Sequence, residues 1–376
     1  MPYPYTVTWE RQCRAISEDD WITCFGTSDA RTSYRVQCWV EDSALPGMDY
    51  HYLIVRGPQE RLVGIIPCFL FRSSLTVVAP VFLQRLAKKI RKAYPGFLYV
   101  NMFVAGSPLA TCRDLLGFHL DETVNDIQTV IDFVSGEIKS RASHVGGSLI
   151  IIKEIEAQKI SCFQKAWGGH FHIAESVATT FLPMAFVGKN SYSSALRHHY
   201  RKLMKQRKSR LAACGGRWES PEMTPKLAAR LYDMYLQVKR RSRVQFEELS
   251  LSFFENIGKL PGSLAKLSVC FVGQTPVSFI LYLHDKQRLF PMYLGMDYHI
   301  RDDYSLYYNA FYRVIEEGED HGVDIVQLGQ TSYEAKSSLG ASLSPLYLGV
   351  SHTNKFINWV LSFMINTLFP PSVPPR

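Results

Sequence analysis

The stretch from 265 to 296, AKLSVCFVGQTPVSFILYLHDKQRLFPMYLGM, contains three apolar runs with the length and composition of β-strands. The runs span 265–272, 276–284 and 289–296. Gaps of three and four residues separate them, and these are hairpin lengths. We therefore predict an antiparallel meander, followed by a helix at 305–317 and by strands at 323–328 and 344–350.

Two helices are predicted before this meander. Residues 191–213 read as one long helix, which Gly215 and Gly216 end. The second helix has Thr224 as a plausible N-cap and Pro225 at its first position. The second half of the chain is therefore expected to run helix, helix, meander, helix, strand and strand.

The first half of the chain reads as a mixed α/β unit. Strand-like runs occur at 52–55, 62–71, 75–82, 97–104 and 148–152, and helical patterns occur at 84–94 and 123–138. The segment RLVGIIPCFL at 61–70 echoes TPVSFILYL at 275–283, and each follows a turn and a strand. This echo hints at a duplicated domain. We predict a first unit at 1–180, a second at 181–350 and an amphipathic tail at 351–376.

Length and composition agree with two globular domains. The chain has 376 residues, of which 47% are apolar, so it can form sizeable cores and is not a disordered protein. Its eight cysteines form no C-x-x-C pair, which argues against a zinc site or a disulfide framework. The first residues lack the basic and apolar segments of a signal peptide. We therefore expect a cytoplasmic protein.

The positive charge of the chain is concentrated in one segment. Lys and Arg number 42 and Asp and Glu 34, an excess of +8. Eight basic residues and no acidic ones lie between 197 and 217, so this segment carries a charge equal to the whole excess. Four of them recur at helical spacing and form what we call the basic stripe. The basic stripe consists of Arg197, Arg201, Lys205 and Lys208.

The basic stripe has two interpretations. Like charges at this spacing weaken an isolated helix, which favours a bound anion that compensates them. The phosphates of a nucleotide-type cofactor, an RNA backbone and acidic lipid headgroups all fit. A solvated helix face is the alternative. On the neighbouring apolar face of the same helix, Arg207 takes the place of an apolar residue after Leu203.

The most informative block lies between 295 and 340. P-loop, dinucleotide-binding, nucleophile-elbow and H-E-x-x-H motifs are absent, and no tightly bound cofactor or metal is expected. The block reads GMDYHIRDDYSLYYNAFYRVIEEG and then VDIVQLGQTSYEAKSSLG. It resembles the C-terminal half of bacterial GNAT-like acyltransferases, in particular the acetyltransferases associated with cellulose biosynthesis, which are related to Fem-type aminoacyl transferases. The positions that carry the resemblance are Gly295, Asp297, Asp324, Gly329, Tyr333, Lys336 and Gly340.

The resemblance implies an α/β (α+β) fold of tandem GNAT-like domains, each a mixed, largely antiparallel sheet flanked by helices. It also implies an acyl-CoA co-substrate, whose thioester would lie between the splayed fourth and fifth strands. The donor's pyrophosphate would bind at the N-terminus of the next helix. Here that loop is 297–305, so Arg301 and Ser305 join the basic stripe as implied donor-binding residues. The loop lacks the family's glycines and carries Asp302 and Asp303; Fem-type relatives also depart from the family loop and use aminoacyl-tRNA.

Three residues of the block are candidates for chemistry, because acylation of an amine needs proton transfer rather than a protein nucleophile. Asp297 is expected to act as the base or to anchor the acceptor ammonium, or else to cap a turn. Tyr333 would protonate the leaving group, or simply pack. Lys336 would bind a phosphate or carboxylate, or pair with Glu334. The two tyrosines at the start of helix 305–317 are expected to pack.

Three functions remain open. The leading hypothesis is an N-acyltransferase that moves an acyl group from an acyl-CoA-type donor to an amine of a small metabolite or envelope precursor. The alternative is a Fem-type transferase that forms a peptide bond from aminoacyl-tRNA. The third is a non-catalytic, membrane-peripheral scaffold, since the apolar residues of 356–369 favour a helix that packs on the body or lies on a membrane surface. No apolar run reaches the roughly 20 residues that span a bilayer.

Overall fold

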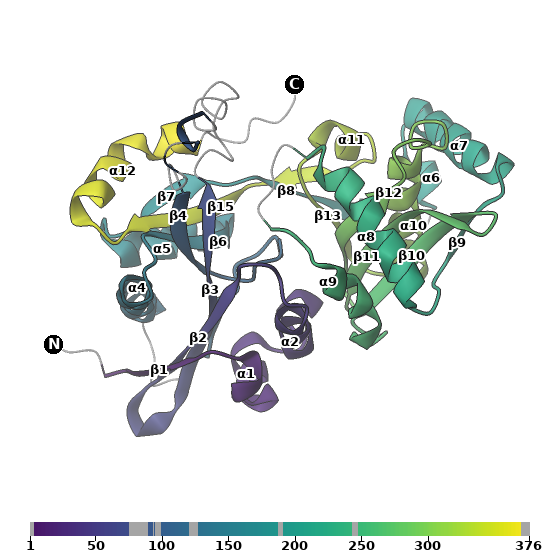
Figure 1. Cartoon of the computed structure of the whole chain (residues 1–376). Helices are drawn as coiled ribbons and strands as arrows, with labels where there is room; N and C mark the ends of the chain where they lie inside the picture. Colours follow the sequence, from purple (N-terminus) through teal and green to yellow (C-terminus); the bar gives the residue numbers. More distant parts are fainter. Residues whose placement is uncertain are drawn as a thin grey trace.

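The computed structural model describes residues 4–74, 89–92, 94, 99–119, 127–186, 191–242 and 247–369. These ranges form two mixed sheets, each covered by helices (Figure 1). The predicted α/β class, with largely antiparallel sheets flanked by helices, is confirmed. The predicted strand at 75–82 and most of the predicted helix at 84–94 lie outside the described residues.

The first sheet combines strands of the first half with one strand from near the end of the chain. In spatial order its strands are β1 (Thr6–Glu10), β2 (Asp49–Arg56), β3 (Leu62–Ser74), β4 (Tyr99–Ala105), β6 (Leu149–Glu156), β15 (Leu346–His352) and β7 (His172–Glu175), and β5 (Gly117–Phe118) pairs with β3. Its described neighbours are antiparallel except β4 and β6, which are parallel.

The second sheet contains the predicted meander. In spatial order its strands are β9 (Gly216–Glu219), β10 (Ala265–Val272), β11 (Thr275–His284), β12 (Arg288–Met296), β13 (Ile325–Gln330), β8 (Thr179–Pro183) and β14 (Ser342–Ser344). β10, β11 and β12 are consecutive and antiparallel, as predicted, whereas β12 and β13 are parallel.

Helices cover both faces of the first sheet. Successive side chains of a strand point to opposite faces, and because the strands carry apolar residues at both sets of positions, both faces need cover. These helices are α1 (Glu18–Phe25), α2 (Tyr34–Asp42), α4 (Ile127–His144), α5 (Ile160–Trp167) and α12 (Lys355–Leu368). On β2, Leu53 and Val55 pack toward α4 and α5, whereas Tyr52 and Ile54 pack toward α1 and α2. α12 covers the remainder of this second face, where Leu361 is buried.

The second sheet follows the same rule. Its helices are α6 (Tyr192–Ala195), α7 (His198–Ala213), α8 (Pro225–Lys239), α9 (Leu251–Glu255), α10 (Leu306–Asp320) and α11 (Tyr333–Ser337). On β11, Phe279 and Leu281 pack toward α8 and α9, whereas Ile280 and Tyr282 pack toward α10. α8 begins as predicted, with the side chain of Thr224 as its N-cap.

The predicted single helix over 191–213 is wrong, because the chain forms two helices there. Leu196 and Arg197 are extended, with ψ values of 145° and 147°, and they separate α6 from α7. The guanidinium of Arg201 donates to the carbonyl oxygens of Ser194 (3.1 Å) and Leu196 (2.9 Å). Arg201 thus takes hydrogen bonds that a continuous helix would make through its backbone.

The two halves exchange a strand, which the predicted domain ranges do not include. β15 was expected to complete the second unit at 181–350, but it lies in the first sheet between β6 and β7. β8 lies on the predicted boundary at 180 and belongs to the second sheet, between β13 and β14. The apolar pattern of a strand predicts its faces but not its partner, so the sequence could not reveal this exchange. The boundaries themselves stay a prediction.

Apolar and polar contacts join the two halves. The ring of Trp39 on α2 lies 4.6 Å from that of Phe253 on α9, and its indole nitrogen donates to the carbonyl of Asn256 at 3.0 Å. Arg31, which is almost fully buried, pairs with Asp29 and also donates to Gln327 of β13 at 2.7 Å. Through these contacts the first half holds β13 of the second sheet in place.

Candidate functional site

The central feature of the second sheet is the separation of β12 and β13. The two strands pair only at Arg288 with Ile325 and at Leu289 with Val326. Beyond these positions β12 continues to pair with β11 and β13 with β8, so the facing edges of β12 and β13 diverge. Two cavities lie beside the diverging ends, one at the start of α10 and one between the strands.

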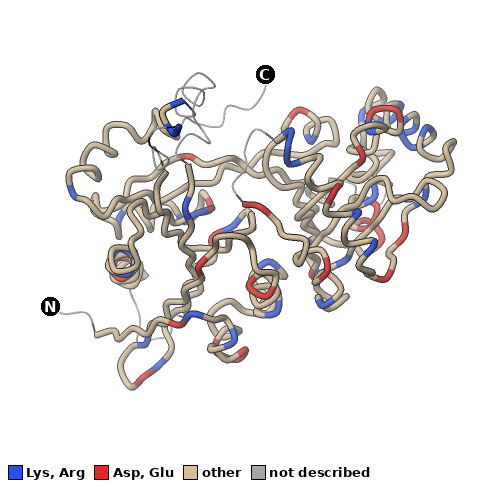
Figure 2. Tube along the Cα trace, in the orientation of Figure 1, with Lys and Arg blue, Asp and Glu red and all other residues tan. Residues whose placement is uncertain are grey.

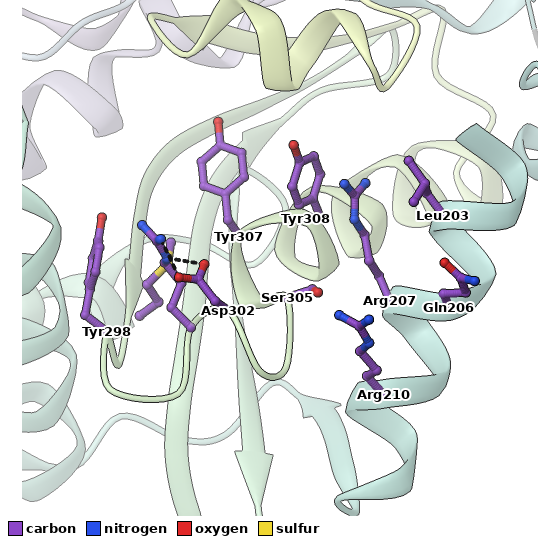
Figure 3. Close-up of a pocket in the computed structure, with 11 residues that line it drawn as sticks. Leu203, Gln206, Arg207, Arg210, Tyr298, Asp302, Ser305, Tyr307 and Tyr308 are labelled. Atoms are coloured by element: carbon purple, nitrogen blue, oxygen red, sulfur yellow. Dashed lines mark hydrogen bonds and ion pairs between the residues drawn. The ribbon is translucent and has the colours of Figure 1, made fainter. Parts of the chain in front are cut away.

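The first of these, which we call the basic cavity, has a volume of about 410 Å³. It is lined by Leu203, Gln206, Arg207 and Arg210 of α7, by Met296, Tyr298, Arg301, Asp302 and Ser305, and by Tyr307 and Tyr308 of α10. Three guanidinium groups against one carboxylate give this lining a formal charge of +2. Figure 3 shows Arg207 and Arg210 projecting from α7 toward the start of α10. The basic cavity is therefore suited to an anion.

Contacts with α10 hold Arg207 in place. Its guanidinium lies 3.4 Å from the centre of the Tyr308 ring and donates to the hydroxyl of Tyr312 at 3.0 Å. The side-chain amide of Asn309 donates to the backbone carbonyl of Arg207 at 3.1 Å, which fixes α7 against α10. An arginine stacked on a ring keeps several N–H donors in a fixed plane, a geometry that suits phosphate oxygens.

Tyr298 lines both cavities, and two guanidinium groups lie near its ring. The charge of Arg241 lies 4.1 Å from the centre of its ring and that of Arg301 lies 4.9 Å away. Arg301 also forms an ion pair with Asp302 at 2.7 Å, which raises the pKa of the guanidinium. The amide of Tyr298 donates to the side chain of Gln237 on α8, so the ring is fixed from its backbone.

The loop before α10 reaches its helix without a glycine. Ser305 precedes the first helical residue with φ of +51°, a left-handed conformation that costs a non-glycine residue of the order of 1 kcal/mol. Two backbone bonds hold it: the Ser305 amide donates to the carbonyl of Asp302 at 3.2 Å, and the Leu306 amide donates to that of Arg301 at 2.9 Å. The start of α10, with its positive dipole end, therefore faces the basic cavity.

The second cavity, which we call the inner cavity, has a volume of about 400 Å³ and lies between β12 and β13. It is lined by residues of β12 from Pro291 to Met296 and of β13 from Leu328 to Gln330, and by charged side chains of neighbouring elements. The charged side chains are Lys239, Arg241, Glu247 and Lys336. The two cavities share Met296, Tyr298 and Tyr307 in their linings, so they adjoin.

Lys336 brings a buried amine to the inner cavity. Its side chain is only 3% exposed, and its Nζ donates to the carbonyl oxygen of Gln330 at 2.6 Å. Burial disfavours the ammonium form and lowers the pKa of Lys336 to about 7. A large share of the amine is therefore neutral near pH 7, in contrast to an ordinary lysine. A neutral amine can accept a proton from a bound molecule.

Glu247 and Tyr307 supply further polar groups to the inner cavity. The hydroxyl of Tyr293 donates to the Glu247 carboxylate at 2.9 Å, and burial raises the pKa of Glu247. Burial also raises the pKa of Tyr307 to about 12, so its hydroxyl keeps its proton at neutral pH. The inner cavity thus brings together an amine with a lowered pKa at Lys336 and a protonated phenol at Tyr307.

Two of the three predicted catalytic residues lie outside the linings of both cavities. Asp297 accepts hydrogen bonds from Arg230 at 2.7 Å and from the amide of His299 at 3.0 Å, the geometry of a turn-capping Asp. Burial opposes its ionisation, but these hydrogen bonds prevail and lower the pKa of Asp297. Tyr333 donates its hydroxyl to the carbonyl of Ala178 at 3.0 Å. Lys336 alone of the three lines a cavity, and its amine bonds Gln330 rather than Glu334.

The predicted donor-binding residues divide in the same way. Arg301 and Ser305 line the basic cavity, whereas no member of the basic stripe does. Arg201 instead bonds the carbonyls at the break before α7, and Lys208 forms an ion pair with Glu316 of α10. The stripe turns away from the basic cavity because α7 presents Arg207 and Arg210, one helical turn apart, to α10.

Several lining residues differ from those that the sequence predicts as site residues. Arg207 carried a signal, since it interrupts the apolar face of its helix, and that face is the one turned toward α10. Tyr307 and Tyr308 were assigned to packing, and both line the basic cavity. Glu247 carried no signal, because its partner Tyr293 is far away in the sequence.

Residues 198–337 match the family model of the acetyltransferase (GNAT) domain. This part of the chain is similar to a GNAT domain. It contains α7, the meander, the splayed strands, the start of α10 and Lys336, and thus most of both cavities. No curated protein matches the sequence.

Solved structures show the same fold over nearly the whole chain. FemX superposes with a TM-score of 0.59 at 11% identity and covers 95% of this chain and 100% of its own. L-PGS from Bacillus licheniformis has a TM-score of 0.52 at 10% identity, with coverage of 94% and 95%. A tandem GNAT protein from the clavulanic acid biosynthesis pathway has a TM-score of 0.51 at 9% identity, with coverage of 93% and 99%. The predicted tandem GNAT-like fold is thereby confirmed, whereas the resemblance to the cellulose-associated group stays a prediction.

Proposed function

We propose that this protein is an N-acyltransferase that takes an acyl group from a CoA-type thioester and transfers it to an amine of a small metabolite or envelope precursor. The observation that carries the proposal is the junction of the basic cavity and the inner cavity at Met296, Tyr298 and Tyr307. One elongated ligand with an anionic end and an acyl end can occupy both. The GNAT family match over 198–337 supports the same type of donor.

In this proposal the basic cavity holds the phosphates of the donor. Arg207, Arg210 and Arg301 provide charged N–H donors, and the start of α10 at Ser305 adds the positive end of its dipole. The pantetheine part and the thioester then extend past Tyr298 into the inner cavity. Backbone edges of the diverging strands β12 and β13 are available there to position the thioester carbonyl.

The reaction needs a proton acceptor and a proton donor. The acceptor amine attacks the thioester carbonyl, a C–N bond forms and the C–S bond breaks. Lys336, neutral in a large share of molecules, takes the proton that the amine loses. Tyr307, which lines both cavities, gives its proton to the leaving thiolate. The Glu247 carboxylate can accept a hydrogen bond from an amine or hydroxyl group of the acceptor substrate and so hold it in the inner cavity.

A comparison of two pairs of charges on one helix tests this arrangement. Calorimetry with acyl-CoAs and thiol release with a panel of amines measure donor affinity and turnover. We expect R207Q/R210Q to weaken donor binding by about ten- to hundredfold, because charged hydrogen bonds to phosphate are lost. K202Q/K205Q removes two positive charges as well, but from exposed positions of α7, and should change donor affinity little. An equal loss in K202Q/K205Q would instead show that the exposed surface of α7, which includes Lys205 of the basic stripe, takes part in donor binding.

Aminoacyl-tRNA is the second candidate donor, and one observation favours it. The loop before α10 has no glycine and carries Asp302, while exposed basic residues continue along α7 from the basic cavity to Lys202 and Lys205. A polynucleotide backbone could follow such a surface. Binding of aminoacyl-tRNA with a steep salt dependence, together with no acyl-CoA binding, would replace the first proposal by this one. A chain that binds and turns over neither donor would favour the non-catalytic scaffold.

A further inference from the structure

The last helix of the described chain, α12, carries large apolar side chains on more than one side. Its sequence from 355 to 368 is KFINWVLSFMINTL, in which Lys355 is the one charged residue. The apolar side of a helix is normally buried. Here only one side of α12 is buried, where Leu361 and Ile365 pack against the first sheet.

The opposite side of α12 exposes large apolar side chains to solvent. Phe356 and Phe363 are each 69% exposed and Trp359 is 59% exposed. The three rings form one ridge, since neighbouring centres lie 6.0 and 5.0 Å apart. Ile357, Met364 and Leu368 are also exposed beside them. Six of the ten large apolar side chains that are exposed in the described part of the chain therefore lie on this helix. A contiguous exposed apolar patch of this kind marks an interaction surface.

Basic residues lie at both ends of this apolar ridge. Lys355 is the first residue of the helix, and Lys139 of α4 lies near it. Burial lowers the pKa of Lys139, and the nearby charge of Lys355 lowers it further. Near the other end, Phe369 and Val100 pack against the same apolar cluster of the first sheet. Figure 2 shows blue segments beside both ends of the helix.

The basic group near the C-terminal end of α12 is built on an exposed tyrosine. Arg72 and Arg91 stack on the ring of Tyr99, at 5.2 and 4.2 Å from its centre. Lys89 and Lys92 next to Arg91 are exposed. Amphipathic aromatic side chains are enriched at membrane–water interfaces, where their apolar part contacts lipid and their polar part contacts water. A tyrosine with cationic neighbours therefore suits the headgroup region.

We propose that the outer face of α12 binds the surface of a membrane that carries anionic headgroups. The rings of the ridge would enter the boundary between headgroups and acyl chains, and the basic residues at both ends would meet lipid phosphates. Within the described ranges no helix is long and apolar enough to cross a bilayer. In this proposal the contact is interfacial, with the helix lying in the plane of the surface.

This surface is separate from both cavities. α12 covers the first sheet, whereas α7 and α10 border the second, and Figure 1 shows the two regions at opposite ends of the molecule. The membrane proposal therefore does not depend on the proposed reaction, and either can fail alone.

Vesicle sedimentation of the full chain tests the proposal. We expect the protein to sediment with phosphatidylcholine vesicles that contain phosphatidylglycerol, and less with phosphatidylcholine alone. F356S/W359S/F363S should lower the partition by about tenfold or more, because three exposed rings lose their apolar burial. The same variant should keep its thermal unfolding midpoint, since all three side chains are exposed. K89Q/K92Q/K355Q should lower the partition on the anionic vesicles and little on the neutral ones.

A matched control removes exposed apolar side chains elsewhere. Ile22 of α1 and Leu251 of α9 are 37% and 38% exposed, and I22S/L251S should sediment as the wild type does. A wild-type chain that stays in the supernatant with both vesicle types overturns the proposal. So does a ridge variant that sediments unchanged. A dimer that forms without vesicles and dissociates in the ridge variant would assign this face to a second copy and also overturn it.

Discussion

Among the described residues the two sheets of this protein have the same strand order, yet they differ at their central parallel pair. The first runs β1, β2, β3, β4, β6, β15, β7, and the second runs β9, β10, β11, β12, β13, β8, β14. In each described sheet the fourth and fifth strands are parallel, and the sixth strand is the exchanged one. The echo between 61–70 and 275–283 has a structural basis, because β3 and β11 both take third place.

The difference lies at the parallel pair. β4 and β6 pair over four residues each, whereas β12 and β13 pair over two. Beyond the end of β4, the stem of Lys153 packs on Gly106, and its Nζ donates to the carbonyls of Ser107 and Leu109, both at 2.9 Å. One lysine bridges the strand ends of the first sheet, whereas Lys336 faces a cavity in the second. Among the described residues, a side chain thus bridges the strand ends of the first sheet, whereas those of the second sheet border the inner cavity.

The largest expected effect concerns the open copy. Lys336→Met should lower acyl transfer by about 10²- to 10⁴-fold, because the proton acceptor is lost. The wild-type kcat/KM should rise as the pH increases through about 7, where the Lys336 ammonium becomes neutral, and should level off above it. The variant should lack this rise. As a control, Glu334→Gln removes an exposed charge from the same helix and should leave the pH profile of the wild type unchanged. If the kcat/KM of Lys336→Met still rises near pH 7, another group is the base.

The second prediction concerns the exchanged strand. A Cβ at Gly349 of β15 would lie 2.2 Å from the ring of Trp167 of α5, which is buried against the first sheet. Gly349→Val should therefore cost about 2–3 kcal/mol of unfolding free energy through overpacking. Hydrogen exchange should increase in β6, β7 and α5 and remain unchanged in β10–β12. Faster exchange in the meander instead would mean that the last strand belongs to the second unit after all.

A second substitution separates this clash from a general defect of the strand. Trp167→Leu in the Gly349→Val background makes room for the added side chain, so the two effects should be far from additive. We expect the double variant to regain part of the lost stability. Additive losses would place the effect of Gly349 in its backbone rather than in contact with Trp167.

The sequence predicted the parts of this comparison that depend on neighbouring residues. The meander at 265–296 and the start of α8 at Thr224 follow from apolar runs, short turns and cap chemistry, which act within a few residues. The partner of β15 and the divergence of β12 from β13 depend on contacts between distant segments. No local pattern encodes them.

The candidate site was predictable to the same extent. The family block indicated Lys336, Arg301 and Ser305, which line the cavities. The choice of the basic stripe over Arg207 depended on which face of α7 meets α10, and charge spacing alone does not decide that. Glu247 meets Tyr293 only through the packing of the second sheet, so it gave no sequence signal.

The smallest expected effect concerns the closed copy. Lys153→Ala removes two hydrogen bonds and leaves the carbonyls of Ser107 and Leu109 without them, which should cost about 1–2 kcal/mol in urea unfolding. Lys153→Met keeps the stem that packs on Gly106 and loses only the amine, so it isolates the hydrogen-bond part.

Calorimetry of the Lys153→Ala protein then shows what closes the first sheet. We expect the number of bound donor molecules to stay at that of the wild type, because β4 and β6 remain paired over four residues. A second bound donor would mean that Lys153 alone closes the first copy, and the length of the parallel pair would no longer explain the difference. An unchanged number together with the stability loss would assign the closure to the strand pairing, with Lys153 as a brace.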